Sequence, residues 1–192
     1  METGAEKRRK PRADSLRNRI RLLETAKAAF TELGADVPLE EIARQAKVGI
    51  GTLYRHFPTR GALLSAVYQR EVEQLGAWAD TLLETRRAGE ALEAWLHLLV
   101  DYMSTKRVIM PALQASTGDS AQVYAASGAT ITDAMKRLTQ AAIDAGDIRS
   151  DVTNDDVYRA MVGVSYGYDQ PGWAQSACRL IDILMAGLKP QS

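Results

Sequence analysis

Residues 49–60 read GIGTLYRHFPTR, and they differ from the Ala-, Leu-, Glu- and Arg-rich sequence on either side. Glycine costs a helix interior about 1 kcal/mol relative to Ala, yet two glycines stand here among several hydrogen-bonding side chains. The stretch predicts a short helix from Ile50 to about His56. Pro58 ends it, because proline disfavours helical geometry in the residue before it, and Thr59 is well placed to cap the next helix.

Two helices are predicted before this one. Apolar residues keep to one face between Ser15 and Leu33, and a short helix follows over 39–46. The three residues Lys47–Gly49 are long enough only for a tight turn, so the arrangement is that of a helix-turn-helix. The small core between these helices is expected to contain Ile42, Ala43, Ala46, Val48, Leu53 and Phe57.

The outer face of the 50–56 helix carries groups suited to the DNA major groove. Hydroxyls and a guanidinium bind phosphates and base edges, and an apolar side chain can contact thymine methyls. The residues left on this face, with the end of the turn, are Gly49, Ile50, Gly51, Thr52, Tyr54, Arg55 and His56.

Charge is unevenly spread although the net charge is zero. Residues 1–60 hold 13 Lys/Arg against 8 Asp/Glu, and residues 61–192 hold 11 against 16. This segregation favours a polyanion-binding end joined to a more acidic body. Residues 1–14 are expected to form a flexible basic arm, which either contacts DNA or serves only as a solvated tail.

Composition excludes several classes of protein. No apolar run approaches the roughly 18 residues that span a bilayer, and no secretory signal is evident at the first residues. A single cysteine, Cys178, excludes an internal disulfide and fits a reducing cytoplasm. With only two histidines, His56 and His97, no Cys/His metal site is expected.

The remaining sequence is also helical, which predicts an all-α protein of about nine helices. A long helix over 60–85 is expected to join a helix-turn-helix domain, residues 15–60, to a C-terminal body, residues 61–192. Glycines and prolines mark the breaks between further helices. These are expected at 89–105, 107–116, 120–145, 154–168 and 173–188.

Residues 39–64, LEEIARQAKVGIGTLYRHFPTRGALL, closely resemble the signature of TetR-family transcriptional regulators, and the resemblance is strong over about 15–68. It implies an all-α homodimer whose helix-turn-helix domain reads a palindromic operator on double-stranded DNA. It also implies that the C-terminal domain binds a small-molecule effector, and most members repress. Such a protein is expected to be cytoplasmic, with no cofactor and no membrane partner.

The resemblance also implies roles for individual residues. Thr52 and Tyr54 match DNA-contacting positions, and the Tyr hydroxyl usually reaches phosphate. His56 matches an aromatic or His position at the DNA backbone. Arg60 matches a basic residue at the start of the fourth helix, where the helix dipole also favours phosphate. Gly51 matches a glycine that lets the recognition helix approach DNA closely.

Four positions depart from the family pattern. Lys47 stands where Gly is frequent, at a cost of about 1 kcal/mol if the turn needs a left-handed residue, and it could offset that cost by touching phosphate. Gly49 replaces a common Ser cap. Ile50 replaces a common Lys, which removes one phosphate contact and suggests an apolar base contact. Gly61 replaces a frequent Glu.

The effector is expected to bind in the C-terminal half, where aromatic, Met and His side chains suit an adaptable pocket. Packing in the core is the competing explanation for each of them. The candidate pocket residues are Trp95, His97, Leu98, Tyr102, Met103, Met110, Leu113, Tyr124, Met161 and Tyr166. The apolar stripes of the last two helices fit the self-complementary dimer interface that the resemblance implies, although part of each stripe would pack within the monomer.

Residues 163–167, GVSYG, match the G-x-S-x-G pattern of hydrolase nucleophiles. That chemistry needs a strand before Ser165 and a later His, and neither is expected here, so no catalytic residue is predicted. Close helix packing explains the glycines better. An enzyme or a carrier of a small apolar molecule on the same helical body is the alternative to a regulator.

Overall fold

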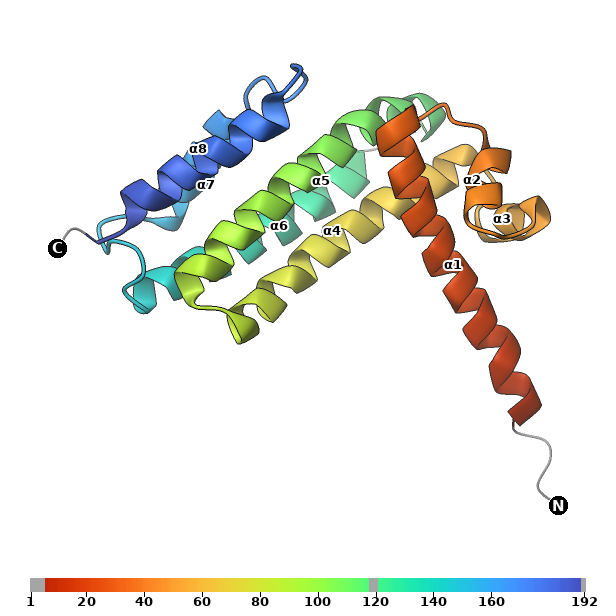
Figure 1. Ribbon diagram of the computed structural model, residues 1–192, viewed down its shortest axis with the longest axis horizontal. Coiled ribbons are helices and arrows are strands. Elements are labelled where there is room, and N and C mark those ends of the chain that lie inside the picture. Colours follow the sequence, from red (N-terminus) through yellow and green to blue (C-terminus); the bar gives the residue numbers. More distant parts are fainter. Residues whose placement is uncertain (1–5, 118–120, 191–192) are drawn as a thin grey trace. The chain divides into compact units, whose positions relative to one another are not determined.

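The computed structural model describes residues 6–117 and 121–190, and over that part of the chain it contains helices and no strand (Figure 1). The expected all-α class is confirmed. The eight helices are α1 Glu6–Leu33, α2 Leu39–Gln45, α3 Ile50–His56, α4 Arg60–Thr85, α5 Ala88–Thr117, α6 Ala121–Asp144, α7 Asn154–Ser165 and α8 Trp173–Leu188. None of these helices combines the length and the apolar character needed to cross a bilayer.

Three helix boundaries differ from the sequence-based expectation. Helix α1 begins at Glu6, so most of the segment expected as a flexible arm is helical. The helices expected at 89–105 and 107–116 are one continuous helix, α5, with Pro111 inside it. Pro111 is exposed, so the carbonyl that loses its helical partner at a proline is not forced into the core. Helix α7 ends at Ser165, three residues early.

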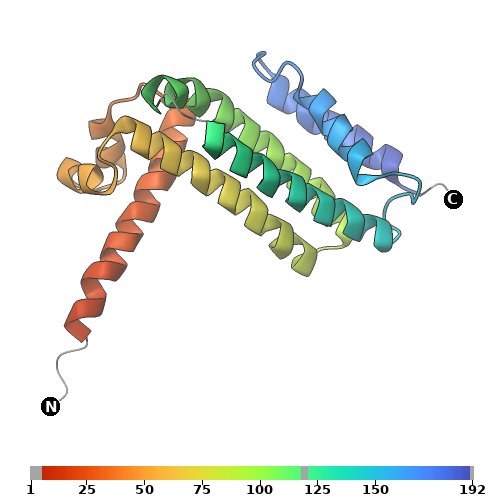
Figure 2. The ribbon, with the colours of Figure 1, turned by 180° about the vertical axis from the view of Figure 1, so that it is seen from behind.

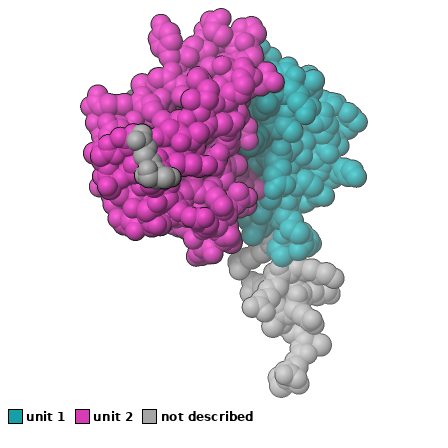
Figure 3. Space-filling model, turned by 60° about the vertical axis from the view of Figure 1, so that its left-hand side comes forward, with its two compact units in different colours: residues 1–68, 108–118 teal, residues 69–107, 119–192 magenta. Residues whose placement is uncertain are grey.

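The chain divides into two compact units, shown in Figure 3. Unit 1 comprises residues 1–68 and 108–118, and unit 2 comprises residues 69–107 and 119–192. Helices α4 and α5 therefore each contribute residues to both units. The end of α5 belongs to the unit that holds the helix-turn-helix, which the sequence pattern did not indicate.

Unit 1 has a small apolar core around α1, α2 and α3. Leu22, Ala26 and Phe30 of α1 are completely or almost completely buried, and their spacing of four residues places them on one helix face. Leu16 and Leu33 were expected on this face but are exposed. The N-terminal part of α1 extends away from α2 and α3 (Figures 1 and 2).

Unit 2 has a larger core built from the remaining helices. The indole of Trp95 is fully buried and donates a hydrogen bond of 2.8 Å to the Leu75 carbonyl, which satisfies its only polar group. A capping box begins α7, where the Thr153 side chain accepts from the Asp156 amide and the Asp156 carboxylate accepts from the Thr153 amide. This reciprocal pair satisfies two backbone amides at the start of α7.

Candidate nucleic-acid interface and effector region

The turn between α2 and α3 is held by backbone hydrogen bonds and by one unusual backbone conformation. The amides of Lys47 and Val48 donate to the carbonyls of Arg44 and Ala43 at 3.1 and 3.0 Å. Lys47 has φ +54°, and among the described residues it is the non-glycine residue with positive φ. The turn therefore does require the left-handed residue that the family's usual glycine would supply at lower cost.

Helix α3 is attached to unit 1 through one face. Leu53 is fully buried and Phe57, just after the helix, is 2% exposed. The guanidinium of Arg19 on α1 lies 4.8 Å from the centre of the Phe57 ring, a cation–π distance. These anchors fix the helix so that its opposite face points outward.

The outward face contains the residues expected to contact DNA. Ile50 and Tyr54 are 37% and 44% exposed, Arg55 is exposed, and Thr52 is half-buried. The Arg55 guanidinium lies 3.4 Å from the Thr52 hydroxyl, so the two polar side chains are neighbours. Hydroxyl, phenol, guanidinium and aliphatic groups are thus presented together on one helix.

Neither backbone conformation nor packing within the chain explains why glycine stands at positions 49 and 51 of this surface. Gly49 precedes α3 in an extended conformation, φ −68° and ψ 145°, which any residue adopts. A Cβ added at Gly49 or Gly51 would meet no atom within 4 Å. The absence of a side chain at Gly51 therefore leaves open space on an exposed surface.

His56 lies at the end of α3 beside positive charge. Partial burial, followed by the charges of Arg19 and Arg55, lowers the pKa of His56 below its ordinary 6.5. The shift favours the neutral imidazole in the free protein. A phosphate placed beside it would have the opposite effect on its pKa, because a negative charge favours the protonated form.

Arg60, which was expected to contact phosphate, also has partners within unit 1. Its Nη1 donates to the carbonyls of Ala35 and Val37, both at 2.8 Å. These carbonyls lie in the loop between α1 and α2, and a part-buried arginine stabilises that loop by satisfying them. Arg60 thus ties the start of α4 to the loop before the helix-turn-helix.

Helix α2 carries an ordered polar group on its surface. The Glu41 carboxylate accepts two hydrogen bonds from Arg44, at 2.8 and 2.5 Å, and one from Gln45 at 2.8 Å. These hydrogen bonds, that of Arg44 first, hold the pKa of Glu41 at about 2. The paired charges reduce the positive charge that Arg44 contributes to this side of unit 1.

Two family models match the chain, and together they cover most of it. Residues 22–67 match the model of bacterial regulatory proteins of the tetR family, and residues 87–190 match the C-terminal domain of SbtR-like transcriptional regulators. The chain belongs to the TetR family. It is a TetR-family transcriptional regulator, as the sequence predicted.

Solved structures agree with this family. The TetR transcriptional regulator SCO0520 from Streptomyces coelicolor is 40% identical, with a TM-score of 0.78 over 91% of this chain and 99% of that one. A TetR transcription regulatory protein from Mycobacterium vanbaalenii is 33% identical, with a TM-score of 0.77 over 93% and 99% of the two chains. Both similarities extend through the C-terminal half.

A curated relative matches only the N-terminal part of this TetR-family chain. The HTH-type transcriptional regulator SAB2452 of Staphylococcus aureus (strain bovine RF122 / ET3-1) is 39% identical over 62 residues, which is 32% of this chain. The match spans about a third, 34%, of that relative's own length. It therefore supports the helix-turn-helix and says nothing of the C-terminal domain.

The residues expected to line an effector pocket have varied surroundings in this TetR-family structure. Trp95, Tyr102 and Met161 are buried, and core packing accounts for Trp95 without a ligand. Leu98 and His97 are half-buried. Met110 and Leu113 are buried within unit 1, and the side chain of Tyr124 lies outside the described residues.

Two of the expected residues do line a common pocket. Met103 and Tyr166 belong to the lining of a pocket of about 490 Å³ at the C-terminal end of α7. Tyr166 is 91% exposed, so it lies at the mouth and not in an enclosed cavity. Whether the effector binds here remains a prediction.

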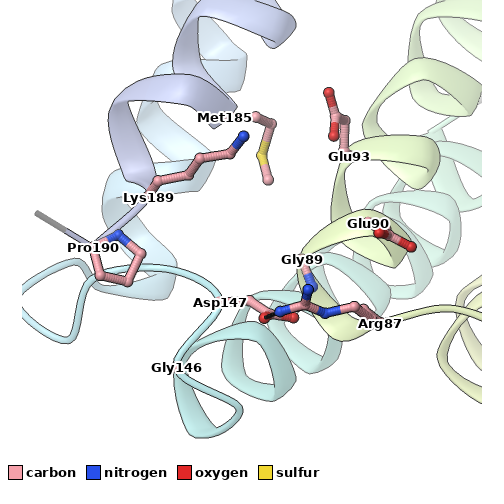
Figure 4. A pocket seen from close by; sticks show the side chains of 9 residues that line it. All are labelled: Arg87, Gly89, Glu90, Glu93, Gly146, Asp147, Met185, Lys189 and Pro190. Atoms are coloured by element: carbon pink, nitrogen blue, oxygen red, sulfur yellow. Dashed lines mark hydrogen bonds and ion pairs between the residues drawn. The ribbon is translucent and has the colours of Figure 1, made fainter. Parts of the chain in front are cut away.

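A second pocket in unit 2 has charged walls and was not indicated by the sequence. Its volume is about 540 Å³, and Figure 4 shows Glu90 and Glu93 of α5 opposite Met185 and Lys189. Asp147 also lines this pocket. Its carboxylate accepts hydrogen bonds from the Gly89 amide at 2.9 Å and from Arg87 at 2.6 Å. These two bonds, the amide first, lower the pKa of Asp147.

Ser165, the serine of the hydrolase-like pattern, has a structural role. It ends α7, and its hydroxyl donates to the Met161 carbonyl at 2.6 Å. Its oxygen also lies 3.3 Å from the sulfur of Met103. A Cβ at Gly163 would meet no atom within 4 Å, so the close packing expected at Gly163 does not occur within the described part of the chain.

Proposed function

We propose that the protein is a transcriptional repressor that binds a palindromic operator on double-stranded DNA as a homodimer and is released by a small-molecule effector. The observation that carries the proposal is the exposed face of α3, held outward by the buried Leu53 and Phe57. Because chromosomal DNA would be its target, the proposed site of action is the cytoplasm.

The surface residues have different proposed roles. Tyr54, Thr52 and Lys47 would contact phosphates, which fix the position of the protein without reading sequence. Arg55 would read guanine, since a guanidinium pairs with its O6 and N7 atoms. Ile50 would contact a thymine methyl.

The remaining residues of the surface have more limited proposed roles. Gly49 and Gly51 would allow the backbone of the protein to approach DNA closely, and His56 would lie beside a phosphate. Arg60 keeps a supporting role, because its guanidinium is already bound to two carbonyls of unit 1.

The proposed homodimer would form through α7 and α8. Each helix exposes an apolar stripe: Tyr158 and Val162 on α7, and Leu180 and Ile183 on α8, of which Ile183 is 67% exposed. Their spacing of three or four residues keeps each pair on one face. Gly187 also leaves open space on α8, where another chain could approach closely.

Oligomeric state tests this part of the proposal. The wild-type chain is expected to elute with the mass of a dimer in size-exclusion chromatography with light scattering, and Ile183→Glu is expected to shift it to the monomer. Leu33→Glu is the matched control, since Leu33 is equally apolar and is exposed on unit 1. A monomeric wild type would refute the homodimer.

Effector binding would act on DNA affinity through α4, whose residues belong to both units. The effector can shift the equilibrium only by its differential affinity for the DNA-binding and released states. The proposed location of the effector is unit 2, which contains several of the expected pocket residues, His97 among them.

A gel-shift assay on the DNA flanking the protein's own gene tests DNA binding. Binding is expected to be palindrome-specific and to weaken steeply with salt. Arg55→Ala is expected to cost about 1–3 kcal/mol and to relax the preference for one base pair. Arg86→Ala is the control, because Arg86 is exposed just after α4 in unit 2. Salt-insensitive binding, or none, would refute the proposal.

A further inference from the structure

Three side chains of unit 2, away from the proposed DNA-binding surface, have potential metal-ligand atoms that lie close to one another. Glu93 and His97 lie one turn apart on α5, and Asp182 lies on α8. One ligand atom from each residue lies within 4.8 Å of the other two. The Nε2 atom of His97 and the Oδ1 atom of Asp182 are 3.0 Å apart.

We propose that Glu93, His97 and Asp182 bind a divalent transition-metal ion of the Zn²⁺ type. One imidazole nitrogen and two carboxylate oxygens form a mixed donor set, and imidazole favours Zn²⁺ and its neighbours over Mg²⁺ or Ca²⁺. The sequence argued against a Cys/His site, and this donor set is a different one because carboxylates supply two of its three ligands.

The geometry requires only small movements. Zn²⁺ lies about 2.0–2.2 Å from nitrogen and oxygen ligands, so ligand atoms around a tetrahedral ion are about 3.3 Å apart. The His97–Asp182 separation of 3.0 Å is already close to this value. The ligand atoms of the three residues are at most 4.8 Å apart. A side-chain movement of about 1.5 Å, which a change of Glu93 rotamer can supply, brings such a pair to the tetrahedral separation.

Access and coordination number also fit. The side chains of His97 and Asp182 are 34% and 58% exposed, so an ion can enter from solvent. Three protein ligands leave a fourth position for water or another molecule. Glu93 also lines the pocket of about 540 Å³ (Figure 4), which places that pocket beside the ion.

The site would join α5 to α8, two helices far apart in the sequence. Resting on the proposed function, we assign the effector to this ion class: binding of the ion in unit 2 changes operator affinity. Coupling between two sites is typically about 5- to 150-fold in affinity, and that range is the expected effect.

Calorimetric titration of the full chain with ZnCl₂, after treatment with a chelator, tests the site. One Zn²⁺ per chain is expected. His97→Ala and Asp182→Asn are each expected to weaken binding at least about tenfold while circular dichroism shows an unchanged fold. Glu84→Gln is expected to retain the wild-type affinity, because Glu84 is an exposed carboxylate on α4. Mg²⁺ at the same concentration is not expected to compete.

A second control concerns the thiol one turn before Asp182. Burial, then the charges of Asp101 and Asp182, raises the pKa of Cys178, which disfavours the thiolate that binds metals. Cys178→Ala is therefore expected to retain the site. Loss of binding in Cys178→Ala would overturn the assigned ligands, and so would equal Zn²⁺ binding by wild type, His97→Ala and Asp182→Asn.

Fluorescence anisotropy with labelled operator DNA separates this inference from the proposed function. Zn²⁺ is expected to change the operator affinity of the wild type but not that of His97→Ala. If calorimetry shows the site and operator affinity does not change, the assignment of the effector is wrong. If the metal-free protein binds no DNA at all, the proposed function fails, while the calorimetric result stands independently.

Discussion

Replacing Gly51 by alanine should separate stability from DNA binding. In the free protein an added Cβ at Gly51 meets no atom within 4 Å, so the substitution introduces no clash. Alanine is the better helix former, and near the first turn of α3 the gain is about 0.5 kcal/mol. For a chain of this length, that corresponds to a rise in Tm of about 1–2 °C.

On DNA the same methyl group should be unfavourable. The proposed function brings the backbone at Gly51 close to the operator, where a methyl group would hold α3 away from the bases. We expect the Kd for operator DNA to rise at least tenfold, or about 1.4 kcal/mol. Fluorescence anisotropy with a labelled operator measures the Kd, and circular dichroism during heating measures the Tm.

Gly128→Ala is the matched control. Gly128 is exposed within α6, and a Cβ there also meets no atom within 4 Å. Its replacement should stabilise the helix by about 1 kcal/mol without changing operator affinity. Wild-type operator affinity in Gly51→Ala would refute the close approach at Gly51, and a lowered Tm would refute the reasoning from open space.

Three other perturbations follow from the structure. Lys47→Gly removes a left-handed lysine, so the free energy of unfolding in urea should rise by up to about 1 kcal/mol, while the loss of a phosphate contact should reduce the salt slope of operator binding by about 1. Thr153→Ala removes the capping box of α7 and should cost about 1 kcal/mol in the same urea titration. The lowered pKa of His56 means that the unfolded chain takes up this proton first as the pH falls. The contribution of His56 to the free energy of unfolding is therefore complete above about pH 6.5 and is lost at lower pH. His56→Gln should flatten the dependence of the free energy of unfolding, measured in urea, on pH between 7.5 and 5.5.

Each of these expectations has a contradicting result. A less stable Lys47→Gly would mean that the lysine side chain stabilises the turn more than its backbone strain costs. An unchanged Thr153→Ala would mean that the cap hydrogen bonds are exchanged for water without loss. An unchanged pH profile in His56→Gln would mean that other groups determine the acid sensitivity.

The helix-turn-helix was predictable because its signals are local. Pro58 determines where α3 ends, and Leu53 and Phe57 recur at a four-residue spacing that buries one helix face. The resemblance to the family, which often has Gly at the position of Lys47, raised the question of whether the turn needs a left-handed residue, and the φ of +54° shows that it does. None of these features depends on residues far away in the chain.

The continuity of α5 was not predictable from the same kind of signal. Two separate helices, over 89–105 and 107–116, were expected where the structure has one. In the structure the Ser104 and Thr105 hydroxyls donate to the carbonyls of Val100 and Asp101, four residues earlier, at 3.1 and 3.2 Å. Such hydrogen bonds let short polar side chains remain inside a helix.

Contacts between distant residues were also beyond the sequence pattern. The phosphate contact expected of Arg60 stays a prediction, but the two carbonyls that its Nη1 atom contacts, more than 20 residues earlier in the chain, were not predicted. Likewise, Glu93 and His97 share a helix face, but nothing in one sequence indicates that Asp182 lies beside them. Only the packing of α5 and α8 within unit 2 reveals that cluster.

A DNase footprint of the full chain on the DNA flanking its own gene tests whether α3 is the recognition helix of a dimeric regulator. The expected result is two protected half-sites of opposite orientation, with centres about one helical turn, roughly 34–36 Å, apart. Protection should disappear with Gly51→Ala and persist with Gly128→Ala at the same protein concentration. A single unpaired site, or protection unchanged by Gly51→Ala, would contradict the assignment of α3 to the major groove.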